Sequence, residues 1–255
     1  FKDLYLANAE EEQALQEGRD VWQEYPVLYL DFNTENYNNE KSMHTILHTH
    51  LVQWEKQYEA DTSEQTFSSR FKGIIRRAYQ QTGKQVVILI DEYDKPLIAT
   101  LENEKLQEEY RATLKAFYSV IKSLNGYIHM SFLTGVTKFS KVSIFSDLNN
   151  LVDISFRSDY STICGLTQEE LEKGFSFNIE ELAKTEGVSY KDMLEILKKK
   201  YDGYHFSEDL INVYNPFSIC NAFDAKKLGD YWFATGTPTF IVQLMEQRAF
   251  DIPDL

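Results

Sequence analysis

Short apolar runs alternate with amphipathic segments over the first 160 residues of the chain. The most uniform run, residues 86–90, holds five apolar residues between a Thr-Gly turn and the acids Asp91 and Glu92. A run this short and uniform is typical of a strand that is buried on both faces of a parallel sheet. We therefore predict that residues 86–90 form the central strand of the fold.

The neighbouring segments complete an α/β pattern. Apolar runs predict three further strands, at 26–33, 128–133 and 152–156. Apolar residues spaced three and four apart predict amphipathic helices at 42–60, 61–82 and 104–124. The second of these helices begins with a capping-box pattern from Asp61 to Glu64, and residues 1–25 predict one or two short helical turns. This alternation favours a parallel sheet with helices on both faces.

After Cys164 the pattern becomes mainly helical. Thr167 and Ser189 each stand three residues before an acid, which predicts the N-caps of two short helices. The remaining predicted elements are a hairpin at 201–214, a helix opened by Pro216 and a helix at 240–247. We therefore expect two domains, an α/β core at 1–162 and a smaller, mainly helical, winged-helix-like domain at 163–255.

Composition narrows the classes of partner. The formal net charge is -14, which disfavours binding to nucleic acid or to an anionic membrane unless a basic face is concentrated somewhere. No apolar segment reaches the roughly 18 residues of a membrane span, and no signal peptide opens the chain. The two cysteines, Cys164 and Cys220, are far apart, as expected of reduced thiols. Together these features predict a cytoplasmic protein.

The acids that follow the predicted central strand are the strongest candidate site. Ligands of open α/β sheets bind outside the carboxyl ends of the strands, where Asp91, Glu92 and Asp94 stand. An apolar strand ending in Asp-Glu matches the Walker B pattern of P-loop NTPases, in which the Asp holds the shell of Mg²⁺ and the Glu polarises the attacking water. Adjacent carboxylates repel one another unless a cation is present. The alternative is an acidic strand end that is solvated or paired with Lys84 and Lys95.

The phosphate-binding loop that such a site needs, GxxxxGK[ST], is absent from the 255 residues. Gly83-Lys84 is the only Gly-Lys pair, and it precedes a strand and is followed by Gln85. Thr134, at the end of the predicted strand 128–133, stands where such enzymes place a polar sensor of the γ-phosphate. On sequence alone a strand-ending Thr-Gly turn is the simpler interpretation. Lys138 is a candidate phosphate contact, with a surface lysine the favoured alternative.

Three histidines, His44, His48 and His50, lie on the predicted helix 42–60. Residues four apart share a helix face, so His44 and His48 suggest a metal site. No HExxH glutamate, cysteine or suitably placed carboxylate completes such a site, and we therefore expect a polar helix flank.

Six segments in this order resemble the bacterial AAA-ATPase-like domain family, over essentially the whole chain. The specific ones are Asp-Glu-Tyr-Asp-Lys-Pro at 91–96 and Trp-Phe-Ala-Thr-Gly-Thr-Pro at 232–238. The weaker ones are Leu-Tyr-Leu-Asp-Phe at 28–32, Thr-Gly-Val-Thr-Lys-Phe at 134–139, Tyr-Asp-Gly-Tyr-His-Phe at 201–206 and Tyr-Asn-Pro-Phe-Ser at 214–218.

The resemblance implies a P-loop NTPase core that uses ATP and Mg²⁺, a winged-helix-like domain and, in many members, a PD-(D/E)xK nuclease-like domain further downstream. By that similarity Asp91 is the magnesium-coordinating acid, Glu92 the catalytic glutamate and Thr134 the sensor. The family's Walker A segment precedes a segment like residues 1–4. We therefore expect this polypeptide neither to bind nor to hydrolyse ATP measurably, and a version that includes the upstream segment to do both.

Two other functions remain open from the residues. A metal-dependent nuclease could use Asp91, Glu92 and Asp94, but Lys95 misses the usual spacing of the lysine in such sites. A non-catalytic adaptor that binds other protein subunits is the second alternative. Its wing tip at 207–209 is acidic, and the lysines at 198–200 suit a helix C-terminus, so contact with nucleic acid is not favoured.

Overall fold

The computed structural model describes residues 4–136 and 150–232, which form two compact units divided after Asn150. Lys138 and the helix expected at 240–247 lie outside the described residues. Among the helices of the described part, none is long and apolar enough to cross a membrane.

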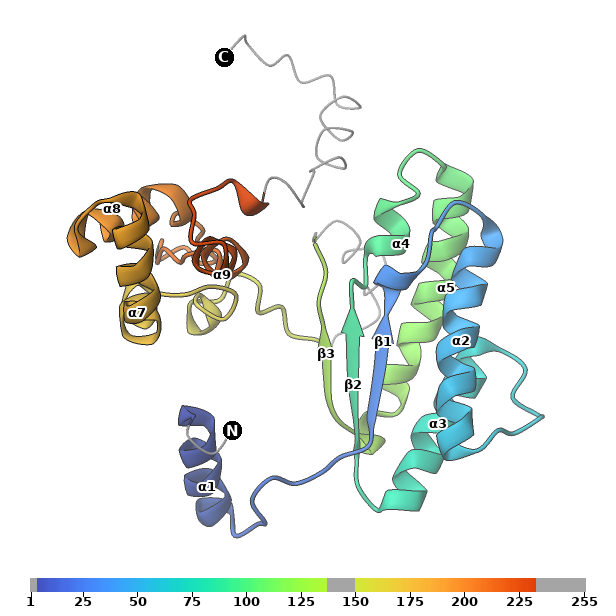
Figure 1. Cartoon of the computed structure of the whole chain (residues 1–255). Coiled ribbons are helices and arrows are strands. Elements are labelled where there is room, and N and C mark those ends of the chain that lie inside the picture. Colours follow the sequence, from blue (N-terminus) through green and yellow to red (C-terminus); the bar gives the residue numbers. More distant parts are fainter. Residues whose placement is uncertain (1–3, 137–149, 233–255) are drawn as a thin grey trace. The chain divides into compact units, whose positions relative to one another are not determined.

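The first unit is built on a three-stranded parallel sheet with strand order β1-β2-β3 (Figure 1). The strands are β1 (Val27–Asp31), β2 (Val86–Asp91) and β3 (Ile128–Leu133). The prediction of a central strand at 86–90 is therefore confirmed. The prediction of a strand at 152–156 was wrong, because that segment pairs with no strand. Val152 and Phe156 are 68% and 56% exposed there.

Three amphipathic helices cover one face of this sheet (Figure 1). They are α2 (Glu40–Tyr58), α3 (Phe67–Thr82) and α5 (Glu104–Ser123), close to the predicted ranges. Shorter helical segments complete the unit: α1 (Tyr5–Glu17), η1 (Phe32–Thr34), α4 (Lys95–Ile98) and η2 (Asn125–Tyr127). The core lies between sheet and helices, where Leu28, Ile88, Phe71 and Phe117 are all at most 1% exposed.

Within the first unit taken by itself, the described helices cover one face of the sheet and leave the other face open, so the prediction of helices on both faces is confirmed there for one face only. Burial alternates along β2 instead of being continuous. On the open face Tyr29 is 47%, Met130 48% and Phe132 40% exposed. An uninterrupted apolar run does not distinguish a strand covered on both faces from one covered on a single face, because its outward residues are apolar in either case.

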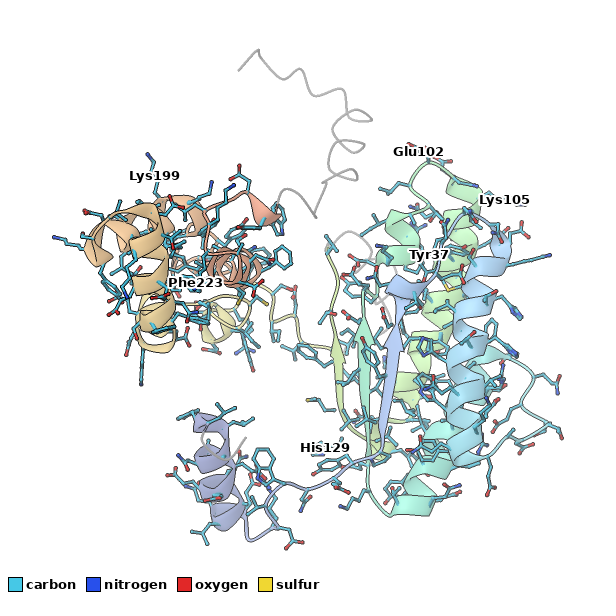
Figure 2. All side chains as sticks on the ribbon, viewed as in Figure 1. Tyr37, Glu102, Lys105, His129, Lys199 and Phe223 are labelled. Atoms are coloured by element: carbon cyan, nitrogen blue, oxygen red, sulfur yellow. The ribbon has the colours of Figure 1, made fainter. Side chains whose placement is uncertain are left out.

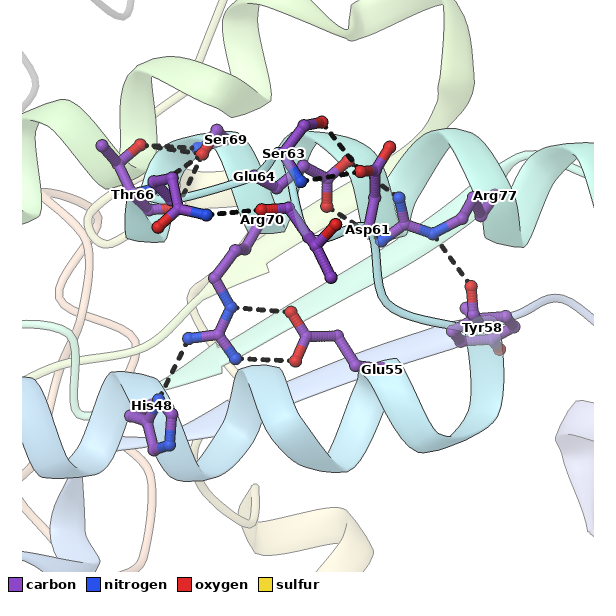
Figure 3. A network of polar contacts seen from close by, with 12 residues as sticks. His48, Glu55, Tyr58, Asp61, Ser63, Glu64, Thr66, Ser69, Arg70 and Arg77 are labelled. Atoms are coloured by element: carbon purple, nitrogen blue, oxygen red, sulfur yellow. Dashed lines mark hydrogen bonds and ion pairs between the residues drawn. The ribbon is translucent and has the colours of Figure 1, made fainter.

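Charged side chains join α3 to α2 and to the loop between them (Figure 3). Arg70 donates two hydrogen bonds to the Glu55 carboxylate, at 2.6 and 2.7 Å, and its Nη1 lies 3.0 Å from His48 Nδ1. Arg77 donates to Glu64 at 2.8 and 3.0 Å, and its Nε bonds the Tyr58 carbonyl at 2.9 Å. Paired guanidinium and carboxylate groups of this kind fix the orientation of a helix pair.

The start of α3 differs from the prediction. Its capping box joins Thr66 and Ser69, whereas Asp61 accepts hydrogen bonds from the backbone and side chain of Ser63 in the preceding loop. Both motifs place a short acceptor side chain over free backbone amides, so the residue types alone did not separate a turn from a helix start.

The second unit packs three helices, α7 (Gln168–Glu186), α8 (Tyr190–Tyr201) and α9 (Pro216–Asp224), with a short η3 (Ser158–Tyr160) before them. The predicted caps at Thr167 and Ser189 are confirmed. Figure 2 shows Phe223 of α9 inside this helical cluster, where it is 7% exposed.

The prediction of a hairpin with two paired strands at 201–214 was wrong. The described residues there hold one isolated antiparallel bridge, Tyr204 with Val213, and Tyr214 pairs instead with Leu166 ahead of α7. The segment reverses direction without building a two-stranded ladder, and an isolated two-stranded hairpin is at best marginally stable in water.

Candidate functional site

The register of the sheet places three polar residues in one row at the carboxyl ends of the strands. Asp31 of β1 is the direct partner of Asp91 of β2. Thr134 follows β3, and its amide donates to the Ile90 carbonyl at 2.9 Å, which brings it beside Asp91. Because side chains alternate along a strand, this row continues the open face of the sheet.

The Asp91 carboxylate receives a hydrogen bond from each neighbouring strand. The Thr134 hydroxyl makes a short hydrogen bond to Oδ1, which also accepts the Glu92 amide at 3.1 Å. The Tyr29 hydroxyl of β1 donates to Oδ2 at 3.3 Å. Groups that are far apart in the sequence therefore converge on a single carboxylate.

Glu92 has an unusual backbone and a buried acceptor. Its φ is 53°, in the left-handed region that costs a non-glycine residue about 1–2 kcal/mol. Its Oε2 is buried and has no hydrogen-bond partner among the described residues. Burial raises the pKa of this carboxyl, and the charges of Asp94, Asp91 and Asp31 raise it further against the opposing effect of Lys95. A carboxyl held in this way is suited to accept a proton.

Lys95 does not neutralise these acids through an ion pair within the described residues. Its ammonium donates to the Asn33 side chain at 3.1 Å, in the loop after β1. Lys84 stands just before β2 starts at Val86, at the amino end of the strand and away from Asp91. The alternative in which Lys84 and Lys95 pair with the acidic strand end therefore finds no support in the described contacts.

Gly135 lies tightly against the site. A Cβ added there would come within 2.6 Å of Asp94 Oδ1 and of the Tyr93 ring. Asp94 is fully buried and accepts the Val136 amide at 3.2 Å. The glycine thus lets the backbone after Thr134 approach the acidic segment.

Replacing Gly135 by Ala should therefore disturb the site. Overpacking a rigid contact of this kind costs about 1–3 kcal/mol in the free energy of unfolding. The expected result is a lower midpoint in urea-induced unfolding, followed by circular dichroism. Gly126→Ala is the matched control, because a Cβ there meets nothing within 4 Å. Equal midpoints for the two variants would contradict the close contact.

The residues fit a magnesium ion that is shared with a phosphate ligand. Among the described residues, no group of three or more His, Cys, Asp and Glu side chains is placed to hold a metal unaided. Mg²⁺ is commonly bound through one or two carboxylates together with phosphates and water, and Asp91 supplies such a carboxylate.

Two histidines of α2 suggested a separate metal site from the sequence. His48 contacts Arg70 and His44 packs against Phe67, as expected of a helix flank.

The sequence predicts Asp91 and Thr134 at one edge of the sheet, but Tyr29 was not predicted to lie beside them. The alternation of side chains along β1 could have indicated this, because it puts Tyr29 and Asp31 on the same face. The hydrogen bond itself depends on how β1 and β2 are aligned, and on a side chain 62 residues away.

Comparisons with known proteins identify the family of the chain. The sequence profile of the family described as "Predicted AAA-ATPase" matches residues 1–145, which include both strands that carry Asp91 and Thr134. A curated relative from Azotobacter chroococcum mcd 1, "Uncharacterized protein in vnfD 5'region", is 36% identical over 227 residues. That alignment covers 89% of this chain and 42% of the relative, so the chain spans less than half of that protein. No solved structure matches. The family profile covers more than half of the 255 residues of the chain, and the chain therefore belongs to the predicted AAA-ATPase family.

Proposed function

We propose that this chain carries the hydrolytic half of an ATPase site, with Asp91 as the magnesium-binding acid and Glu92 as the base. The observation that supports this most is the hydrogen-bonded row at the carboxyl end of the sheet, where Asp91 is held by Thr134 and lies beside Glu92. Ligands of open α/β sheets bind at this edge.

The chemistry of each residue follows from its surroundings. Bound Mg²⁺ would neutralise charge on the β- and γ-phosphates, and an Asp91 oxygen is the ligand that this chain offers to it. Glu92 would orient the attacking water and take up its proton, because its buried Oε2 is free to accept one. The Thr134 hydroxyl would orient the Asp91 carboxylate and contact the γ-phosphate.

The proposal requires a phosphate-binding loop. The 255 residues contain no GxxxxGK[ST] motif, and the amides and lysine of such a loop provide much of the affinity for phosphate. We therefore propose that nucleotide binds in a longer protein, in which sequence preceding Phe1 supplies the loop. The second unit, which we propose to be winged-helix-like, and a nuclease-like domain beyond it would be candidates to respond to the bound nucleotide.

Calorimetric titration with Mg-ATP tests this proposal. The 255-residue chain should show no measurable heat of binding, whereas the protein encoded by the complete gene should bind Mg-ATP and hydrolyse it. Micromolar binding of Mg-ATP by the 255-residue chain alone would contradict the proposal that another segment supplies the phosphate-binding loop. A complete protein that neither binds nor hydrolyses ATP would contradict the function.

A further inference from the structure

Tyr29 is an aromatic residue on the open face of the sheet whose hydroxyl reaches the candidate site. It stands on β1 two residues before Asp31, and its hydroxyl donates to Asp91 Oδ2 at 3.3 Å. The ring is 47% exposed, so its position does not follow from burial in the core. A polar contact joins this side chain to the strand end.

The chemical nature of this donor matters for a cation site. A tyrosine hydroxyl is protonated at neutral pH, so Tyr29 contacts Asp91 as an uncharged donor. A lysine or arginine at this position would also orient Asp91, but its positive charge would oppose a metal ion at the same carboxylate. A neutral donor orients the carboxylate and leaves its negative charge available.

The two hydroxyls hold different oxygens of the same carboxylate. Thr134 donates to Oδ1 from the end of β3, and Tyr29 donates to Oδ2 from β1 on the opposite side of β2. A carboxylate that is hydrogen-bonded through both oxygens loses rotation about its terminal bond. Metal ligands are commonly oriented by such outer hydrogen bonds.

We propose that Tyr29 is a positioning residue that, together with Thr134, fixes the Asp91 carboxylate in the orientation in which it receives the magnesium ion. This inference rests on the proposed function for its consequence in catalysis. The contact itself is a property of the 255-residue chain and can be tested without activity.

The contact is tested by NMR of the chain labelled with ¹³Cζ-tyrosine. The Tyr29 resonance is identified by its loss in Tyr29→Phe, and its chemical shift is then compared between wild type, Asp91→Ala and Asp31→Asn. Asp91→Ala removes the acceptor, whereas Asp31→Asn removes one neighbouring charge and leaves the contact in place. We expect a clearly larger change for Asp91→Ala. An equal or smaller change than for Asp31→Asn would overturn the proposal.

The consequence is tested in the complete ATPase by varying the Mg²⁺ concentration. Tyr29→Phe should raise the half-saturating Mg²⁺ concentration about three- to tenfold, the range expected for loss of one ordinary hydrogen bond of an exposed side chain. The kcat at saturating Mg²⁺ should stay near the wild-type value. Tyr5→Phe is the matched control, since it removes a hydroxyl from an 87% exposed side chain. An unchanged or lower Mg²⁺ requirement in Tyr29→Phe would overturn the proposal.

The two experiments distinguish a failure of the proposed function from a failure of the proposed role of Tyr29. If the complete protein shows no ATPase activity at all, the proposed function is wrong, and the NMR comparison still decides whether Tyr29 holds Asp91. If activity is present and both Tyr29 readouts are unchanged, the ATPase stands and the positioning role is wrong.

Discussion

Replacing Glu92 by Gln should lower kcat for ATP hydrolysis in the complete protein by about 10²- to 10⁴-fold, the usual contribution of a general base. The amide keeps the size and shape of the side chain but cannot take up the proton of the attacking water. The affinity for Mg-ATP should remain close to wild type, because Asp91 and the proposed phosphate-binding loop are unchanged.

Steady-state kinetics and a parallel binding titration measure the two effects of Glu92→Gln separately. Glu102→Gln is the matched control, because Glu102 is exposed on the loop before α5, as Figure 2 shows. If Glu92→Gln kept most of the activity, Glu92 would not be the base. If it abolished ATP binding as well, its role would be structural. An adaptor without catalysis would be indifferent to the change.

Replacing Phe71 by Ala should cause the largest loss of stability. Phe71 is fully buried at the centre of the helical layer, with its ring stacked on Phe117 at 4.4 Å between centroids and 5.7 Å from Trp54. Truncation removes this burial and leaves a cavity, at a cost of about 3–5 kcal/mol in the free energy of unfolding.

Urea-induced unfolding of the chain, followed by circular dichroism, measures this cost. Phe177→Ala is the control, since Phe177 is 69% exposed on α7 and its truncation should change stability by no more than about 0.5 kcal/mol. If the Phe71 and Phe177 variants unfolded at the same urea concentration, the helical layer would not be packed as described.

The sequence predicted those elements that carry a strong local signal. The periodicity of α5 and the apolar run of β2 each fixed the position of an element to within a residue or two. The segment 152–156 carried a weaker signal of alternating apolar residues and forms no strand, because a strand also requires a partner edge. The open face of the sheet was missed for a similar reason, since covering a face depends on other segments of the chain.

The candidate site was predictable in part. Asp91 and Thr134 follow parallel neighbouring strands, and the rule that ligands bind at carboxyl ends was enough to place them at one edge. The left-handed backbone of Glu92, the close approach at Gly135 and the hydrogen bond from Tyr29 were not predictable. Each depends on distances between segments that only the folded chain brings together.

We propose that metal and nucleotide bind at the carboxyl end of β2. The most direct test uses the complete protein with ATP and Mn²⁺ in place of Mg²⁺, and ¹³C-methyl-labelled threonine. The paramagnetic ion should broaden the Thr134 methyl resonance beyond detection. It should leave Thr82 largely unaffected, because Thr82 precedes the amino end of β2, roughly 20 Å away along a six-residue strand. Equal broadening of the two methyls, or a sharp Thr134 signal with Mn-ATP bound, would contradict the account.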